Sequence, residues 1–170
     1  MPLRKPEGIP KIPKTRKKKP ENALTAIPAK KPDKIEYLCK AFYKYDIPSK
    51  KQYCAFAIET AVEFTSFAYE ISVDVIKERN VINLIIMGLT ARTNIVPEIQ
   101  PARNEVLFED LLGDFTVNVV KQDGAVNTGE YYFNIYKKEI VLKEQYKPKK
   151  KNNRLFCTFS VAVDEFSFPG

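Results

Sequence analysis

The sequence contains no histidine, and this absence removes the side chain that most often serves as general base, catalytic-triad partner or metal ligand. The three cysteines, Cys39, Cys54 and Cys157, are odd in number and form no Cys-x-x-Cys pair. Neither a disulfide framework nor a zinc site is therefore indicated. We expect the three thiols to be reduced and buried, and we expect no metal and no cofactor.

The motifs of common enzymes are also absent. There is no GxxxxGK or GxGxxG phosphate-binding loop, no GxSxG nucleophile elbow and no HExxH metal motif. The acids in 109–110 and 164–165 are adjacent, so on a helix or strand they point in different directions, and solvated charge explains them better than a catalytic pair. We therefore expect a protein that is not an enzyme.

Long apolar runs are missing too. The longest candidate, residues 81–89, contains Asn83 and Gly88 and falls short of the ~18 residues of a membrane span. The N-terminus has no apolar core of the signal-peptide kind, and its prolines argue against an amphipathic presequence. We expect no membrane insertion and an intracellular location, either cytoplasmic or nuclear.

What the chain does contain is an uneven distribution of charge. Residues 1–34 hold eleven Lys/Arg against three Asp/Glu, a net charge of +8, and the whole chain has +7, so the remainder has a net charge of −1. Residues 147–154 contribute +5 to that remainder, which leaves about −6 for everything else. The sequence therefore describes a mildly acidic body with two basic appendages.

The first appendage is a tail. Seven of the twelve prolines fall in residues 1–34, where apolar residues are few and not periodic. Such a segment buries too little surface to offset the entropy of ordering, so we expect a disordered basic tail over residues 1–32 and one domain over residues 33–170.

Periodicity in the body predicts an α+β fold. Apolar residues recur at helical spacing in 34–45 and again in 49–64, and each stretch opens with capping-box spacing, Asp33 with Glu36 and Ser49 with Gln52. Alternation predicts strands near 69–75, from 115 and in 155–163, with a hairpin whose second strand spans 130–142. Residues 81–90 follow a turn and predict a strand that is apolar on both faces. The prolines at 97 and 101 exclude a central strand, and 104–112 reads as a short helix in a long crossover. We expect two N-terminal helices packed on an antiparallel sheet of about five strands.

Clustered cations in an extended segment release counterions from phosphate polymers, so the basic appendages indicate contact with RNA or DNA. The candidate nucleic-acid-binding residues are Lys11, Lys14, Arg16, Lys17, Lys18 and Lys19 in the tail and Lys147, Lys149, Lys150, Lys151 and Arg154 in the loop. Residues 14–20 also match a nuclear-import signal, and the aromatic and basic run 131–138 is a candidate stacking platform for unpaired bases.

The leading hypothesis is thus a non-catalytic, nucleic-acid-binding structural or assembly protein, such as a ribonucleoprotein or packaging subunit, in which tail and loop form two ends of one contact. One alternative is a protein-interaction subunit of a larger complex, whose tail docks on an acidic partner. Another is a small ligand-binding α+β domain with an apolar pocket between helices and sheet.

Overall fold

The structure, a computed structural model, describes residues 19–64, 68–92 and 99–170. One short helix precedes nine strands, and a 3-10 turn follows them. The elements are α1 Pro20–Thr25, β1 Tyr37–Asp46, β2 Lys51–Phe64, β3 Ala68–Glu78, β4 Val81–Arg92, β5 Gln100–Phe108, β6 Gly113–Lys121, β7 Val126–Asn134, β8 Glu139–Tyr146, β9 Cys157–Val161 and η1 Val163–Glu165.

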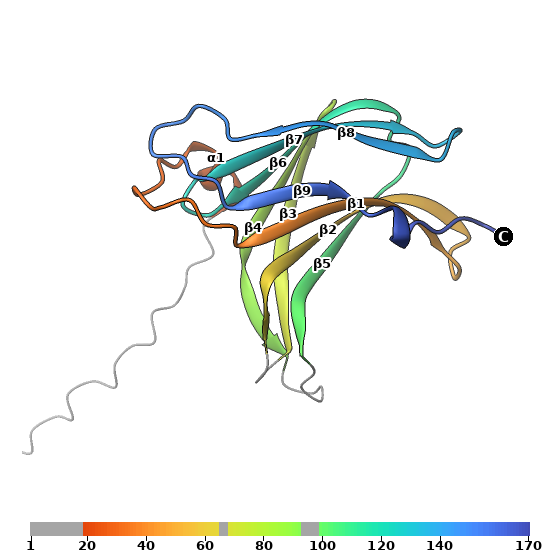
Figure 1. Ribbon diagram of the computed structural model, residues 1–170, viewed down its shortest axis with the longest axis horizontal. Coiled ribbons are helices and arrows are strands. Elements are labelled where there is room, and N and C mark those ends of the chain that lie inside the picture. Colours follow the sequence, from red (N-terminus) through yellow and green to blue (C-terminus); the bar gives the residue numbers. More distant parts are fainter. Residues whose placement is uncertain (1–18, 65–67, 93–98) are drawn as a thin grey trace, which may run out of the picture.

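The strands form two sheets that pack face to face (Figure 1). One sheet has four strands in the order β5-β2-β1-β9, and the other has five in the order β3-β4-β6-β7-β8. Neighbouring strands run antiparallel, except that β1 pairs in parallel with β9 and β4 with β6. The expected single antiparallel sheet is therefore wrong, because the described chain forms two mixed sheets.

The α+β fold class is wrong for the same reason. The residues expected to form two helices, 34–45 and 49–64, form the antiparallel pair β1 and β2. Every second residue of β1 from Tyr37 to Tyr43 belongs to the core between the sheets. Phe42, on the opposite face, is buried as well, against Ala162. Because both faces of β1 carry apolar residues, the two-residue period is masked and helical spacing emerges by chance.

The Ser49 and Gln52 spacing lies at a hairpin turn and not at a helix start. The Asp46 carboxylate accepts hydrogen bonds from the backbone N–H of Ser49, at 3.1 Å, and from its hydroxyl. Lys50 then takes a left-handed conformation with φ +55°. Ser49 thus closes the tight turn between β1 and β2 with Asp46, whereas the Gln52 side chain donates to the carbonyls of Tyr53 and Ser167.

The expected helix at 104–112 is also wrong, because most of it belongs to β5. This strand starts at Gln100 and includes Pro101, which pairs with Glu63 after a shift in register. An edge strand tolerates proline, since one side of its backbone needs no ladder hydrogen bond. The expected strand over 130–142 is two strands, β7 and β8, with a turn between them. Strands are confirmed as β3, β4 and β9, and the hairpin of β6 with β7 is confirmed.

Side-chain hydrogen bonds join the two sheets along both sides of the sandwich. On one side, the Asn104 side chain donates a hydrogen bond to the carbonyl of Ile71 in β3, at 2.7 Å. On the other, the Gln145 side chain accepts from the backbone N–H of Phe159 at 3.0 Å, and the Tyr131 hydroxyl donates to the carbonyl of Ser160 at 3.1 Å. The outer edge of β9 is thus satisfied by side chains of the opposite sheet.

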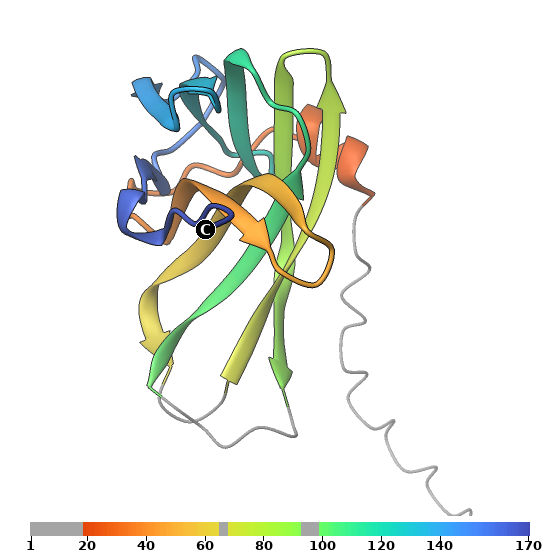
Figure 2. The same ribbon diagram turned by 90° about the vertical axis from the view of Figure 1, so that its right-hand side faces the viewer.

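Helix α1 lies on the outside of the five-stranded sheet, over β4 and β6 (Figure 2). Ala23 is fully buried there, against Ile85, Met87 and Val120. Part of the segment that composition predicts to be a disordered tail therefore contacts the body.

Candidate nucleic-acid interface

The basic loop between β8 and β9, residues 147–154, is fixed to the body by Asn153. Its side-chain amide donates to the carbonyls of Val126, at 2.8 Å, and Pro148, at 2.9 Å, and its side-chain oxygen accepts from the N–H of Val126 at 2.9 Å. Asn153 therefore binds both polar groups of one β7 residue while closing its own loop. The backbone that carries the lysines between Pro148 and Asn153 is therefore fixed, so less conformational entropy is lost when these lysines bind a partner.

Arg154, at the end of this loop, faces inward. Its side chain is only 4% exposed, and its guanidinium lies 2.8 Å from the Asp123 carboxylate and 3.5 Å from that of Glu36. It also lies over the ring of Phe156, 5.7 Å from the centroid. The charge of Arg154 is therefore compensated within the fold, where it joins the loop to the β6–β7 turn.

The surroundings of Asp123 change the pKa of its carboxyl group. Partial burial alone would raise its pKa, but the hydrogen bond from the backbone N–H of Ala125 and the nearby Arg154 guanidinium outweigh burial, and the pKa is lowered. Asp123 is thus held as an anion that orders the β6–β7 turn and the base of the loop.

The four lysines of the loop differ in their surroundings. Lys150 is half-buried and donates to the carbonyl of Gly124 at 2.7 Å, and burial lowers its pKa. Lys147 is exposed and lies 4.0 Å from the Asp33 carboxylate. Lys149 and Lys151 are exposed, and neither forms an ion pair with any described residue. The two unpaired lysines are therefore the members of the loop that are best placed to meet an external anion.

The fold brings a second lysine-bearing segment beside this loop. Backbone N–H of Lys34 donates to the carbonyl of Leu155 at 3.1 Å, and the N–H of Leu155 donates to the Asp33 side chain at 2.9 Å. Figure 1 shows the orange segment before β1 and the blue loop before β9 at the same end of the molecule. The exposed lysines that this segment adds are Lys30, Lys31 and Lys34.

These three lysines are absent from the candidate residues named above. Their charge is visible in the sequence, but their position beside the loop depends on the parallel pairing of β1 with β9, which no local pattern indicates. The expected tail residues Lys11, Lys14, Arg16, Lys17 and Lys18 lie outside the described residues, and Lys19 is exposed directly before α1.

The expected stacking platform is largely internal. Tyr131 and Phe133 are fully buried in the core, while Tyr136, at the β7–β8 turn, is 85% exposed. That turn lies at the end of the molecule remote from the 147–154 loop (Figure 1). Two of the four aromatic side chains in this run are thus unable to stack on a base.

Among the residues that the structure describes, the two expected helices are strands, so the expected apolar pocket between helices and sheet is wrong. One cavity of about 110 Å³ lies between the β1–β2 hairpin and Ile135, lined in part by Tyr43, Cys54 and Leu111. Ligand sites commonly measure roughly 300–1,000 Å³, so it holds only a very small molecule. In the part of the chain that the structure describes, no helix is long and apolar enough to cross a membrane, and no three His, Cys, Asp or Glu side chains are grouped to hold a metal ion.

The geometry defines a class: a β-sandwich of two mixed sheets with a structured basic surface at one end. The chain matches no protein-family model, no curated protein and no solved structure.

Proposed function

We propose that this protein is a non-catalytic nucleic-acid-binding component of a larger assembly. It binds the phosphate backbone through its basic N-terminal segment, residues 1–34, and its basic loop, residues 147–154. The observation that supports the proposal is the adjacency of two lysine-bearing segments, 30–34 and 147–151, at one end of a body that is otherwise mildly acidic.

The exposed lysines determine how the protein would contact a nucleic acid. Lysine ammonium groups bind phosphate oxygens without distinguishing bases, whereas sequence readout needs side chains on base edges. Tyr146 borders the loop, but its hydroxyl already donates to Glu130 at 2.9 Å. Sequence-independent binding with a steep dependence on salt is therefore expected.

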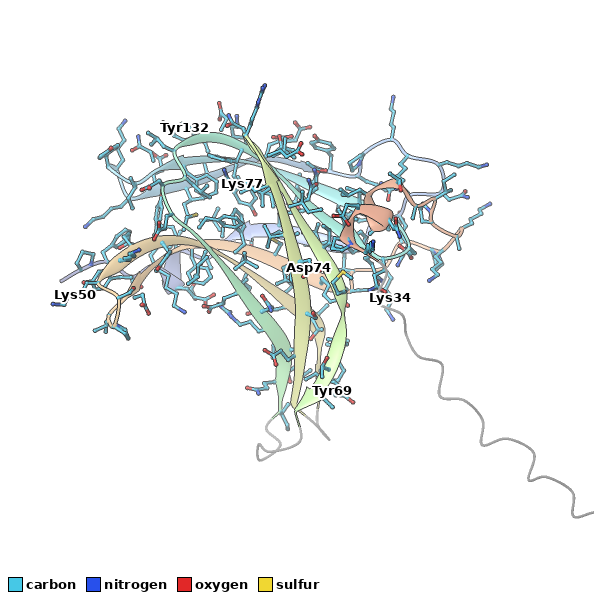
Figure 3. All side chains as sticks on the ribbon, turned by 180° about the vertical axis from the view of Figure 1, so that it is seen from behind. Lys34, Lys50, Tyr69, Asp74, Lys77 and Tyr132 are labelled. Carbon is cyan, nitrogen blue, oxygen red and sulfur yellow. The ribbon has the colours of Figure 1, made fainter. Side chains whose placement is uncertain are left out.

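The test is a titration of the full chain with mixed-sequence RNA and DNA at 50 to 200 mM NaCl. The variant Lys149→Gln/Lys151→Gln removes two cations of the loop. The matched control, Lys50→Gln/Lys137→Gln, removes two exposed cations at the turns of the other end; Figure 3 shows Lys50 there, opposite Lys34. Each lost phosphate contact lowers the slope of log K against log salt by roughly 0.7–0.9.

We expect the loop variant to reduce the slope by about 1 to 2 and the control to leave it unchanged. Deleting residues 1–18 should reduce it further. Equal slopes for all variants contradict the proposal. Salt-sensitive binding to polyglutamate, with none to RNA or DNA, would instead favour an acidic protein partner.

A further inference from the structure

A cavity of about 250 Å³ lies where β6 ends and β4 continues. The last residue pair between these two strands joins Ile86 to Lys121, whereas β4 runs on to Arg92. The Gln122 side chain donates to the carbonyl of Met87, at 2.7 Å, and so replaces one hydrogen bond of the missing strand. On this side of β4 no described strand continues the ladder beyond Ile86, and the cavity remains in its place.

The walls of the cavity are largely apolar. Ile86 and Met87 contribute buried side chains from β4, and Tyr37 contributes an aromatic ring from the start of β1. Gly88 also lines the cavity, and a Cβ at this position would meet no atom within 4 Å. The volume is just below the roughly 300–1,000 Å³ of sites that hold drug-sized ligands, so the cavity has room for a small flat group.

The charged side chains of the cavity are already paired within the fold. Lys121, which lines the cavity, donates to the Glu36 carboxylate at 2.7 Å. Asp123, which also lines it, lies 2.8 Å from the Arg154 guanidinium. A phosphate placed here would meet two carboxylates whose partners are engaged, so the cavity suits a neutral group better than an anion.

Two polar atoms of the lining residues remain to bind such a group. The Tyr37 hydroxyl and the side-chain oxygen of Gln122 have no hydrogen-bond partner among the described residues. A hydroxyl can donate or accept, and an amide oxygen accepts. A flat group with apolar faces and with donors and acceptors along its edge is therefore complementary to the cavity, and a nucleobase is such a group.

The β6–β7 turn, which forms one wall of the cavity, also touches both lysine-bearing segments. Asp123 lies 3.7 Å from the ammonium of Lys31. The carbonyl of the next residue, Gly124, accepts a hydrogen bond from Lys150 at 2.7 Å. The chain before the first segment lies against the same turn, because a Cβ at Gly124 would come within 2.1 Å of the Ala26 carbonyl oxygen. A strand bound by these lysines is therefore beside the cavity.

We propose that the cavity receives one unpaired base of a single-stranded nucleic acid whose phosphates lie on the two lysine-bearing segments. This inference rests on the proposed function and names single strands as the class of partner. In a duplex each base is stacked and paired, and extruding one costs free energy, so a duplex cannot use the cavity without that cost. Since every base has flat apolar faces, the cavity requires a base but no particular sequence.

The test measures binding of the full chain to three ligands: a mixed-sequence 20-nucleotide DNA single strand, a strand of the same length with abasic sites throughout, and the base-bearing strand in a duplex. The abasic strand keeps every phosphate and has no base. Tyr37→Phe removes only the hydroxyl from the cavity wall. The matched control, Tyr136→Phe, removes a hydroxyl that is exposed at the other end of the molecule. Thermal unfolding reports whether each variant stays folded.

We expect the base-bearing single strand to bind about tenfold more tightly than the abasic strand, because one base held against an aromatic side chain contributes a factor of this order. Tyr37→Phe should weaken binding of the base-bearing single strand roughly two- to tenfold, as expected for one lost hydrogen bond. It should leave binding of the abasic strand and the duplex unchanged, and Tyr136→Phe should change none of the three. If Tyr37→Phe destabilises the protein, Gln122→Ala is measured in the same way.

Equal binding of the base-bearing and abasic single strands overturns the base-binding cavity and leaves the proposed function standing, since phosphates alone then account for the affinity. A variant of the cavity that weakens all three ligands equally also overturns it, because the loss is then independent of the base. Absence of binding to RNA and DNA by the unsubstituted chain overturns both proposals.

Discussion

The Arg154 guanidinium lies 2.8 Å from the Asp123 carboxylate and ties the basic loop to the β6–β7 turn. The positive charge of Arg154 made it a candidate nucleic-acid contact. Its side chain is only 4% exposed, however, and its guanidinium forms an ion pair within the fold. The loop is therefore divided by function: one cation stabilises the fold, and its exposed lysines remain available to a partner.

Replacing Arg154 should therefore destabilise the protein more than it affects nucleic-acid contact. Arg154→Met removes the closest cation from Asp123 and one of the two cations beside Glu36, which keep Lys31 at 3.7 Å and Lys121 at 2.7 Å. Because both carboxylates also keep access to water, we expect a loss of about 2 kcal/mol in the free energy of unfolding. Lys151→Met, with the same charge change on the surface, should stay within about 0.5 kcal/mol. Urea unfolding measures both, and equal effects would show that the Arg154 pair contributes nothing.

The stability should fall in acid partly through Asp123. Its pKa is lowered in the folded protein, so its contribution is full above the unfolded pKa, near pH 4, and is lost as the pH falls through the folded value. Asp123→Asn should thus be less stable than the unsubstituted protein at pH 7, and the difference should shrink below about pH 4. Chemical unfolding from pH 7 to pH 3 measures this difference, and a gap that stays constant with pH contradicts the assignment.

Asn127 should be among the most sensitive polar positions. It is 1% exposed, and its side-chain oxygen accepts from the N–H groups of Phe156 and Cys157, both at 2.8 Å. Asn127→Ala leaves two buried donors without a partner, and we expect a loss of about 2–4 kcal/mol in the free energy of unfolding. The exposed Asn22→Ala is the control, and a small effect at Asn127 would mean that water replaces its oxygen.

The cysteines should be unreactive in the folded protein. Burial raises the pKa of Cys39 to about 12 and that of Cys157 well above its ordinary value, so almost no thiolate is present at pH 8. We expect none of the three thiols to react with a disulfide reagent at pH 8 without denaturant, and all three to react in guanidinium chloride. Rapid modification of any thiol in the native protein would contradict this placement.

Local patterns predicted β3 and the hairpin of β6 with β7, because polar and apolar residues alternate there and turn residues separate the strands. They also predicted β4, because its short apolar run follows a turn. They failed at β1 and β2, where Phe42 and its neighbours are covered on both faces and mimic helical spacing. Of the candidate site residues, the exposed loop lysines were recognisable from composition. The inward position of Arg154 was not, since nothing in the run 147–154 distinguishes a paired cation from a free one.

The sequence alone determined the amount and location of charge along the chain: a basic segment at 1–34, a second at 147–154 and a mildly acidic remainder. Only the tertiary structure decided that residues 26–34 of the first segment lie beside the second, through the parallel pairing of β1 with β9 and the contacts of Ala26 and Lys150 with Gly124. The physical reason is separation along the chain. Charge is a property of each residue, whereas adjacency of residues more than a hundred positions apart depends on how the two sheets close.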